Sequence, residues 1–360
     1  MGQADLLPES REVSPKGGAD TRVVLQADGV SVRYKRGDST LQAVSNVSLR
    51  LERGEVLGIV GESGSGKSTF ARTILRLLPR DAKIDGRLLL GDLDLSGLSE
   101  REFNRRVRWS QVSMVFQDAM NALNPVIRIK DQISEVIIRH GSVGKREAEE
   151  RAADLIVVVG LDENVLNRYP HQLSGGMRQR VCIAMAFACD PVLLLADEPT
   201  TALDVITQDR VIAEMLRVCR ERHASMIFIS HDIALVSEVA DRIGVMYAGH
   251  LVELGDAITV LREPSHPYTI GLLNAFPRAD IDKEVISIPG DPARFKETPS
   301  LCPFSARCPF AEDICRSEAP PVAEIAPGHA AACHFPDRAA SFRTRGADPD
   351  VWSAVEGAAV

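Results

Sequence analysis

The sequence predicts an α/β fold built around a mostly parallel sheet, and three stretches carry that prediction. An apolar run at 56–60 leads through a glycine-rich loop, 61–69, into a helical pattern that ends near Leu78. Two further apolar runs, 192–196 and 225–230, each end in polar residues, and a helical pattern follows the first of them at 202–222. Buried parallel strands have this near-continuous apolar character, and they present functional groups at their carboxyl ends. We therefore expect Gly61, Glu198 and His231 to meet at one edge of the sheet.

The loop itself has the spacing G-x-x-x-x-G-K-[ST] of a phosphate-binding loop. Glycines allow its backbone N–H groups to converge on phosphate oxygens, and the helix that follows adds its positive end. Lys67 is expected to reach the β- and γ-phosphates of a nucleotide, and the Ser68 hydroxyl to join a Mg²⁺ shell. A plain glycine-rich turn is the alternative, and the strand–loop–helix context argues against it. The residues expected to bind ATP here are Gly61, Ser63, Gly64, Ser65, Gly66, Lys67, Ser68 and Thr69.

Length and composition set the limits of the fold. With 360 residues and 45% hydrophobic content, the chain can bury one large domain with an appendage, or two domains. A net charge of −8 does not favour nonspecific electrostatic binding of nucleic acid. We find no run near the roughly 18 uninterrupted apolar residues of a membrane span. Residues 1–20 resemble neither a secretory signal nor a lipidated end. Cys182, Cys189 and Cys219 fall in helical apolar patterns and are expected to be reduced core residues of a cytosolic protein.

Alternating patterns at 23–34 and 44–51 predict two strands that each have one covered face. Tyr34 is then a strand residue that packs on its neighbours or, if the loop holds ATP, an aromatic ring that stacks on adenine. A short strand and turn follow at 87–92, then a charged helix at 99–109 and a strand at 112–116 that ends at Gln117. Residues 131–161 have helical spacing, and their charge run indicates a solvated helix face within a helical insertion.

The second half contains two further functional clusters. Ser174 is a predicted helix N-cap, and Gly175 with Gly176 leaves N–H groups exposed to an anion at the mouth of that helix. Asp197 and Glu198 end a buried strand, where acids are costly unless something uses them. A Mg²⁺ ion beside ATP would use Asp197, leaving Glu198 to polarise a water. A helix over 202–222 and a hairpin over 242–254, with its turn at 248–250, complete this part.

Together these residues resemble the ATP-binding subunit of an ABC transporter. Residues 61–69 resemble the Walker A motif, Gln117 the Q-loop, 173–179 the signature, 193–198 the Walker B motif, 202–204 the D-loop and His231 the switch histidine. The resemblance implies a P-loop NTPase fold of the ABC ATPase type: an α/β fold with a mostly parallel sheet core, an antiparallel β subdomain, a helical subdomain and a small cysteine-containing C-terminal extension.

The resemblance also implies roles for these residues in a head-to-tail ATPase dimer that uses ATP and Mg²⁺. The signature residues of one subunit would close on ATP held by the Walker A loop of its partner. The resemblance implies that Glu198 is the general base, that His231 contacts the γ-phosphate and that Gln117 links Mg²⁺ or water to the helical insertion. It implies that Ser68, Gln117 and Asp197 form the Mg²⁺ shell and that Tyr34 is the adenine platform. The signature contacts would come from Ser174, Gly175, Gly176 and Gln179, and the D-loop residue would be Asp204.

A narrower resemblance, to the oligopeptide/dipeptide (and nickel) importer branch, lies in residues 117–125, Met177 and residues 264–269. It covers nearly everything from about 22 to 336 and implies a peripheral protein on the cytoplasmic face of the inner membrane. The implied partners are two integral-membrane permeases, a second ATPase subunit that is a paralogue or a copy, and, indirectly, an extracytoplasmic solute-binding protein. We expect a disordered tail at 1–20, the nucleotide-binding domain at 21–260 with its helical subdomain at about 118–180, the extension at 261–340 and a tail at 341–360.

Four further cysteines form a cluster in the extension with the spacing C-x5-C-x6-C-x17-C. Four thiols within about thirty residues of a cytosolic chain favour metal over disulfides. The spacing leaves a [4Fe–4S] cluster, zinc and no metal open. The family resemblance favours the iron–sulfur cluster and makes zinc the less favoured metal. The residues concerned are Cys302, Cys308, Cys315 and Cys333.

Two other classes of protein compete with the transporter ATPase. A simple P-loop kinase would lack the Ser174-Gly175-Gly176 helix mouth and the switch histidine. Soluble ABC ATPases that act on nucleic acid or ribosomes carry long insertions or two ATPase domains, whereas this chain has one set of motifs. We therefore expect an ATPase that energises import of peptides or related small solutes, and no nucleic-acid partner. The sequence does not identify the solute.

Overall fold

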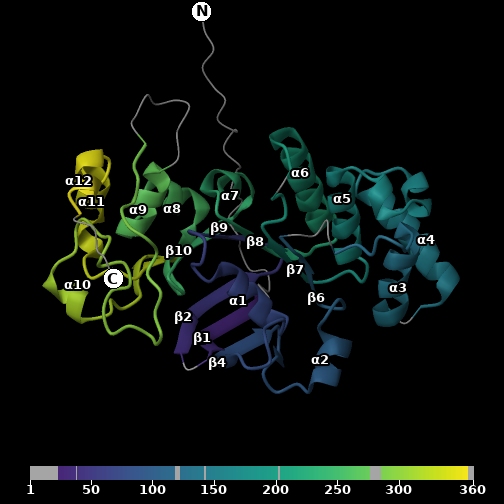
Figure 1. Ribbon diagram of the computed structural model, residues 1–360, viewed down its shortest axis with the longest axis horizontal. Coiled ribbons are helices and arrows are strands. Elements are labelled where there is room, and N and C mark those ends of the chain that lie inside the picture. The colour runs from purple at the N-terminus through teal and green to yellow at the C-terminus, as the bar shows by residue number, and fades with distance from the viewer. Residues whose placement is uncertain are drawn as a thin grey trace, which may run out of the picture.

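The computed structural model describes residues 23–37, 39–117, 122–141, 143–201, 203–275 and 285–355. The predicted tail at 1–20, residues 118–121 of the Q-loop segment and Ala202 of the D-loop lie outside these ranges. Figure 1 shows helices α3 (Ile129–Gly141) and α4 (Lys145–Val158) at one end of the molecule. Helices α10 (Asp313–Ser317), α11 (Ala339–Arg345) and α12 (Pro349–Ser353) lie at the opposite end, with the strands between.

The larger sheet has eight strands in the order β11-β12-β10-β9-β3-β8-β7-β6. The five strands β9, β3, β8, β7 and β6 run parallel to one another, as predicted. Beyond β9, the strands β10, β12 and β11 extend the sheet, and each pairs antiparallel with its neighbours. The parallel strands β3, β6, β7 and β8 are buried along their whole length. The strands are β3 (Val56–Val60), β6 (Val112–Val115), β7 (Leu193–Asp197), β8 (Ser225–Ser230), β9 (Arg242–Tyr247), β10 (His250–Asp256), β11 (Ala323–Ala326) and β12 (His329–Ala331).

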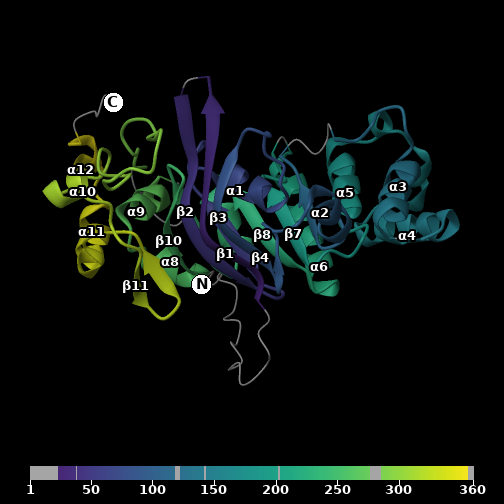
Figure 2. The ribbon, with the colours of Figure 1, turned by 90° about the horizontal axis from the view of Figure 1, so that it is seen from below.

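A second, four-stranded antiparallel sheet lies in front of the larger one in Figure 2. Its strand order is β2-β1-β4-β5, from β1 (Val23–Arg36), β2 (Ser39–Glu52), β4 (Lys83–Leu90) and β5 (Leu93–Asp94). Burial alternates along β2, so one face is covered, as the sequence pattern predicted. Strand β2 begins at Ser39, five residues before the start that its alternation indicated.

The core has two layers, one on each face of the larger sheet. Leu57 and Ile59 of β3 pack towards the antiparallel sheet and helix α1 (Lys67–Ile74), whose Phe70 is fully buried. Val56 and Val60 of the same strand pack into the core on the other side. That second layer contains residues of α5 (Gly175–Ala186), α6 (Val205–Glu221), α7 (Ile233–Val239), α8 (Ala257–Arg262) and α9 (Pro267–Asn274). The alternation of β3 residues between layers fixes the register of this strand.

The helical insertion contains α3, α4 and two 3₁₀ turns, η2 (Glu163–Asn167) and η3 (Pro170–Gln172), before α5. On α4 the charged residues form ion pairs one turn apart on an exposed face, as in Arg146–Glu150 and Arg151–Glu147. The charge run is therefore a solvated helix face, as predicted. A further charged helix, α2 (Glu100–Arg106), begins with a capping box between Ser99 and Glu102.

The prediction of a tail at 341–360 is wrong for its described part. Helices α11 and α12 follow the turn η4 (Pro336–Arg338), and Phe342 and Trp352 are 4% and 1% exposed. Trp352 donates its indole N–H to the Gly346 carbonyl at 3.0 Å, and Phe342 stacks on Phe310 with 4.5 Å between ring centroids. Two aromatic side chains provide enough apolar surface to hold short helices that have little stability of their own.

Candidate functional site: a phosphate loop between two sheets

The glycine-rich loop connects the end of β3 to the start of α1, as predicted. Gly61 and Gly66 have φ of +150° and +101°, a region that side chains disfavour. A Cβ at Gly61 would lie 2.1 Å from the Met246 carbonyl oxygen, and one at Gly66 would lie 2.4 Å from the Ala43 carbonyl oxygen. The loop therefore needs glycine at both positions because it packs directly on the backbone of β9 and β2.

Lys67 is 5% exposed, and its ammonium group lies inside the loop. Nζ donates to the carbonyl oxygens of Gly61 and Glu62 at 2.7 and 2.9 Å. Burial lowers the pKa of Lys67, while the negative charges of Glu198, Asp197 and Glu62 act in the opposite direction. The structure thus places a desolvated cation at the loop, where it strengthens attraction for a phosphate.

Asp197 ends strand β7 beside this loop and is fully buried. The Ser68 hydroxyl donates to its Oδ1 at 2.7 Å, and Arg72 lies 3.8 Å from Oδ2. Oδ2 has no hydrogen-bond partner among the described residues. Burial raises the pKa of Asp197, opposed by the Ser68 hydrogen bond and by Arg72. A buried carboxylate oxygen without a hydrogen bond, next to a hydroxyl, fits a hard divalent cation such as Mg²⁺.

Glu198, the next residue, has a left-handed backbone with φ of +46°. Its N–H donates to the Ile229 carbonyl on β8 at 2.9 Å. Its carboxylate accepts from Gln117 Nε2 at 2.9 Å and from Thr201 Oγ1 at 3.2 Å, and His231 Nδ1 lies 3.2 Å from Oε1. Backbone strain of this kind clusters at functional sites. The structure therefore brings together all three predicted catalytic residues: Gln117 lies 81 positions before Glu198 in the sequence, and His231 lies 33 positions after it.

A cavity of about 330 Å³ opens over the phosphate loop. Tyr34 lies on its wall, and its hydroxyl donates to Thr69 Oγ1 at 3.3 Å. This places the aromatic ring beside the loop, where an adenine base can stack on it. The lining residues are Tyr34, Leu41, Gln42, Ala43, Ser63, Gly64, Gly66, Lys67, Ser68, Thr69, Gln117, Glu198, Ala248, Ala293 and Arg294.

The signature residues lie elsewhere. Ser174 is exposed and caps α5 by accepting from Met177 N at 3.3 Å. Ser174, Gly175 and Gly176 are not among the described residues that line the phosphate cavity. The Gln179 side chain is buried and donates to the Pro199 carbonyl, close to the end of β7. Within one chain, the signature helix and the phosphate loop therefore form separate surfaces.

Asp204 caps helix α6 next to the signature. Its carboxylate accepts from Thr207 N at 3.0 Å and from the Thr207 hydroxyl at 2.7 Å, and these bonds lower the pKa of Asp204. A Cβ at Gly176 would lie only 2.6 Å from Thr207 Cγ2. A larger residue at Gly176 would therefore force Thr207, in the first turn of α6, to shift, a contact that the sequence did not reveal.

The four cysteines of the extension line one small cavity of about 20 Å³. Burial raises the pKa of Cys302 to about 12 and that of Cys333 to about 11, so both are neutral thiols at pH 7. In the described ranges, no group of three or more His, Cys, Asp or Glu side chains is arranged to hold a metal ion. The cavity has room for about one water molecule. The donor atoms suit a metal, but the arrangement does not, so the structure does not support the iron–sulfur prediction.

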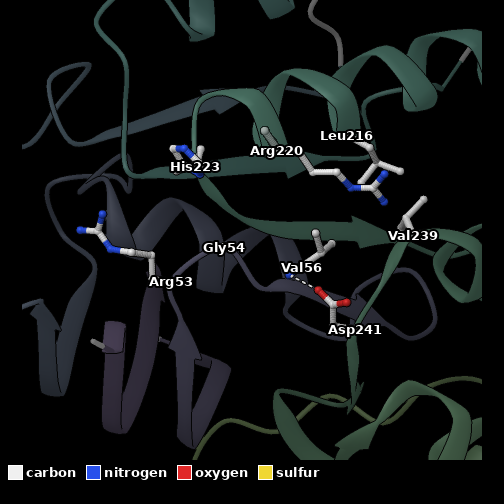
Figure 3. Close-up of a pocket in the computed structure, with 10 residues that line it drawn as sticks. Arg53, Gly54, Val56, Leu216, Arg220, His223, Val239 and Asp241 are labelled. Carbon is white, nitrogen blue, oxygen red and sulfur yellow. Dashed lines mark hydrogen bonds between the residues drawn. The ribbon is translucent and has the colours of Figure 1, made fainter. Parts of the chain in front are cut away.

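A larger cavity, of about 640 Å³, lies at the amino-terminal end of β3, away from the phosphate loop. Figure 3 shows Arg53, Arg220 and His223 around it, with Asp241 accepting a hydrogen bond from Val56 N at 2.9 Å. None of the residues that line it is a predicted site residue. The size of a cavity alone therefore does not identify the nucleotide site.

Two groups at the nucleotide site were missed from the sequence, and both come from the C-terminal extension. Ala293 and Arg294 line the phosphate cavity, more than 220 positions after the loop. Arg307, itself buried, forms an ion pair at 2.7 Å with Glu62 of the loop, which is partly exposed. No local spacing signal marks a contact between residues so far apart.

Among the described helices, none is long and apolar enough to cross a bilayer.

Comparisons with known proteins agree with this geometry. Residues 44–201 match the family described as "ABC transporter", and residues 252–315 match "Oligopeptide/dipeptide transporter, C-terminal region". The chain is 42% identical over 328 residues to the oligopeptide transport ATP-binding protein OppD of Salmonella typhimurium, covering 90% of this chain and 97% of that one. It is 41% identical over 330 residues to the dipeptide transport ATP-binding protein DppD of Bacillus subtilis, covering 90% and 98%.

Among solved structures, the chain is similar to the ATP-binding cassette MJ0796, described as a dimeric post-hydrolysis state bound to ADP and Pi. The TM-score is 0.58 at 30% sequence identity, and the match covers 65% of this chain and 98% of that one. The match therefore extends over an entire ATP-binding cassette and leaves about a third of this chain beyond it.

Proposed function

Because this chain belongs to the ABC transporter family of ATP-binding proteins, among the oligopeptide and dipeptide transport members, we propose that it hydrolyses ATP to energise peptide import. Identity of about 42% extends over 90% of the chain and includes the C-terminal region that distinguishes this branch. The observation that carries the chemistry is the convergence of Lys67, Ser68 and Glu198 on one cavity of about 330 Å³, with Asp197 buried behind Ser68. Peptides or related small solutes are the class of cargo.

We assign the following roles at the nucleotide. Lys67 and the loop N–H groups bind the phosphates, and Tyr34 stacks on adenine. Ser68, Asp197 and Gln117 would hold Mg²⁺, which supplies charge neutralisation at the phosphates. Glu198 accepts the proton of the attacking water.

His231 and Gln117 orient the carboxylate of Glu198. Both have a side-chain nitrogen within 3.2 Å of the carboxylate, so they fix its orientation. The left-handed backbone of Glu198 is held by the hydrogen bond from its N–H to the Ile229 carbonyl of β8, and the side chain lies beside His231 and Gln117. His231 is 63% exposed and is free to contact a γ-phosphate that enters the cavity.

We propose that a second ATPase subunit completes the site. Ser174, Gly175 and Gly176 lie on a surface separate from the phosphate cavity, at a helix end that suits an anion. They would close on ATP held by the partner's loop, and Asp204 beside them would contact that partner. ATP drives closure because it binds the closed dimer better than the open one. The second subunit is a paralogue or a copy of this chain.

The remaining partners follow from the transporter assignment. We propose two integral-membrane permeases that hold this subunit at the cytoplasmic face of the inner membrane, and a solute-binding protein that acts from the other side. Residues 21–260 form the nucleotide-binding domain, with the helical subdomain at about 118–180 in contact with the permeases. The extension begins at 261.

The competing function is that of a soluble ABC ATPase that acts on nucleic acid or ribosomes. The net charge of −8 and the match to the transporter C-terminal region both weigh against it. Affinity purification from detergent-solubilised membranes separates the two functions. Two polytopic permeases should be recovered with this subunit, and recovery with ribosomes or DNA in their place would reject transport.

The iron–sulfur cluster stays a separate prediction, supported only by four thiols that line one cavity. Anaerobically purified protein should then contain iron and sulfide in equal amounts and absorb broadly in the blue. Colourless protein that contains zinc or no metal would reject the cluster without affecting the ATPase assignment.

A further inference from the structure

We propose that Arg307, in the C-terminal extension, is a positioning residue for the phosphate loop, which it holds in its ATP-binding shape through Glu62. The inference rests on ATP binding at residues 61–69. It gives the extension a direct part in the nucleotide site, which none of the predicted motifs includes.

The Arg307 guanidinium is fully engaged. Nη1 and Nη2 donate to the two carboxylate oxygens of Glu62 at 2.7 and 3.0 Å, a bidentate pair. Nε donates to the Pro289 carbonyl at 2.6 Å, and Nη2 also reaches the Ile288 carbonyl at 3.3 Å. Nη1 lies 3.4 Å from the Tyr247 hydroxyl, and the guanidinium lies over that ring. Lysine cannot reproduce this planar set of contacts.

Glu62 passes this constraint to the loop backbone. Its carbonyl oxygen accepts from Lys67 Nζ at 2.9 Å and from Ser65 N at 3.1 Å. Its N–H donates to the hydroxyl of Tyr268, a fully buried residue of helix α9. Tyr268 and Arg307 both belong to the extension. The extension therefore contacts Glu62 twice, at its backbone N–H through Tyr268 and at its carboxylate through Arg307.

The ion pair between Arg307 and Glu62 also neutralises the negative charge of Glu62 at the loop. Arg307 is 5% exposed. Burial alone would lower the pKa of Arg307, but hydrogen bonds to Glu62 and Tyr247 raise it above its ordinary value, so it is always charged. Without this partner, the Glu62 carboxylate would be a partly buried, uncompensated negative charge in the phosphate loop, close to Lys67. Removing Arg307 would therefore destabilise the loop, although the 25% exposure of the Glu62 side chain lets water reduce the cost.

The test compares nucleotide binding by the full chain and three variants. Arg307→Met keeps the bulk and removes the charge, and it should weaken the Kd for MgATP roughly 10- to 100-fold, as expected for a displaced binding loop. Tyr268→Phe removes only the acceptor for Glu62 N and should weaken binding roughly 2- to 10-fold. The matched control is Arg338→Met, which breaks an exposed ion pair to Glu312 in the same extension and should leave the Kd unchanged.

Kinetics separate positioning from a purely structural role. A positioning residue raises KM for ATP more than it lowers kcat, whereas partial unfolding lowers kcat in proportion to the folded fraction and leaves KM unchanged. Thermal melting of each variant gives the folded fraction. If Arg307→Met does not fold, Tyr268→Phe and Arg307→Lys carry the same test, and Arg307→Lys should still lose several-fold in affinity.

A double-variant cycle shows whether the effect passes through Glu62. In a Glu62→Gln background, Arg307→Met should add little further loss of ATP affinity, because the two act as one unit. Additive losses, or a Kd equal to that of the wild type in folded Arg307→Met and Tyr268→Phe, would overturn the inference. Failure of the wild-type chain to bind ATP would instead reject the proposed function.

Discussion

Replacing Glu198 by glutamine is the sharpest perturbation of the proposed chemistry. The carboxylate accepts hydrogen bonds from Gln117 and Thr201 and lies 3.2 Å from His231 Nδ1, and glutamine has the same size and length. The variant therefore keeps the local packing and loses only the proton acceptor.

Loss of a positioned general base costs roughly 10²- to 10⁴-fold in rate, which corresponds to about 3–5 kcal/mol in the activation barrier. ATP affinity should be retained or improved, because one negative charge beside the γ-phosphate is gone. We expect stable ATP-bound dimers that elute early in size-exclusion chromatography, and phosphate release near background.

Phosphate release at saturating ATP and direct binding of labelled ATP measure the two quantities separately. Glu221→Gln is a matched control, since Glu221 pairs with Arg217 on the exposed face of α6, away from the nucleotide. If Glu198→Gln hydrolyses ATP within about threefold of the wild-type rate, Glu198 is not the base and the reasoning from its geometry fails.

Three further outcomes follow from the structure. Lys67→Ala should weaken nucleotide binding itself, as measured by ATP titration, because it removes the cation held inside the loop. Burial lowers the pKa of His266 to about 4, below its unfolded value near 6.5, so stability should be complete above pH 6.5 and should fall by about 3 kcal/mol towards pH 4. In urea unfolding, His266→Asn should remove most of this slope. Trp352→Ala should cost about 3–5 kcal/mol in the same assay, and a loss below about 1 kcal/mol would mean that α12 is not part of the core.

The parts of the fold that were predictable depend on local patterns. The loop between β3 and α1, the buried strand that ends at Asp197 and the hairpin turn at 248–250 each have a short-range signal: glycine spacing, an apolar run or a turn residue. The convergence of Glu198 and His231 was also predictable, because parallel strands bring their carboxyl ends to one edge. Their side-chain geometry was not.

The parts that were missed depend on contacts between distant residues. Nothing around Arg307 marks it as different from a surface arginine, and its role emerges only when the extension folds back over Glu62, 245 positions earlier. Helices α11 and α12 were missed for a similar reason. They are five to seven residues long, too short to give a periodic pattern, and are held by Phe342 and Trp352 packing on other elements.

The most direct test of the central claim is ATP hydrolysis by this subunit assembled with its permeases in lipid vesicles. Peptide-loaded solute-binding protein should stimulate hydrolysis several-fold over the peptide-free protein, and Glu198→Gln should abolish the stimulated rate. Hydrolysis that ignores peptide and responds instead to ribosomes or nucleic acid would contradict the assignment as the ATPase of a peptide importer.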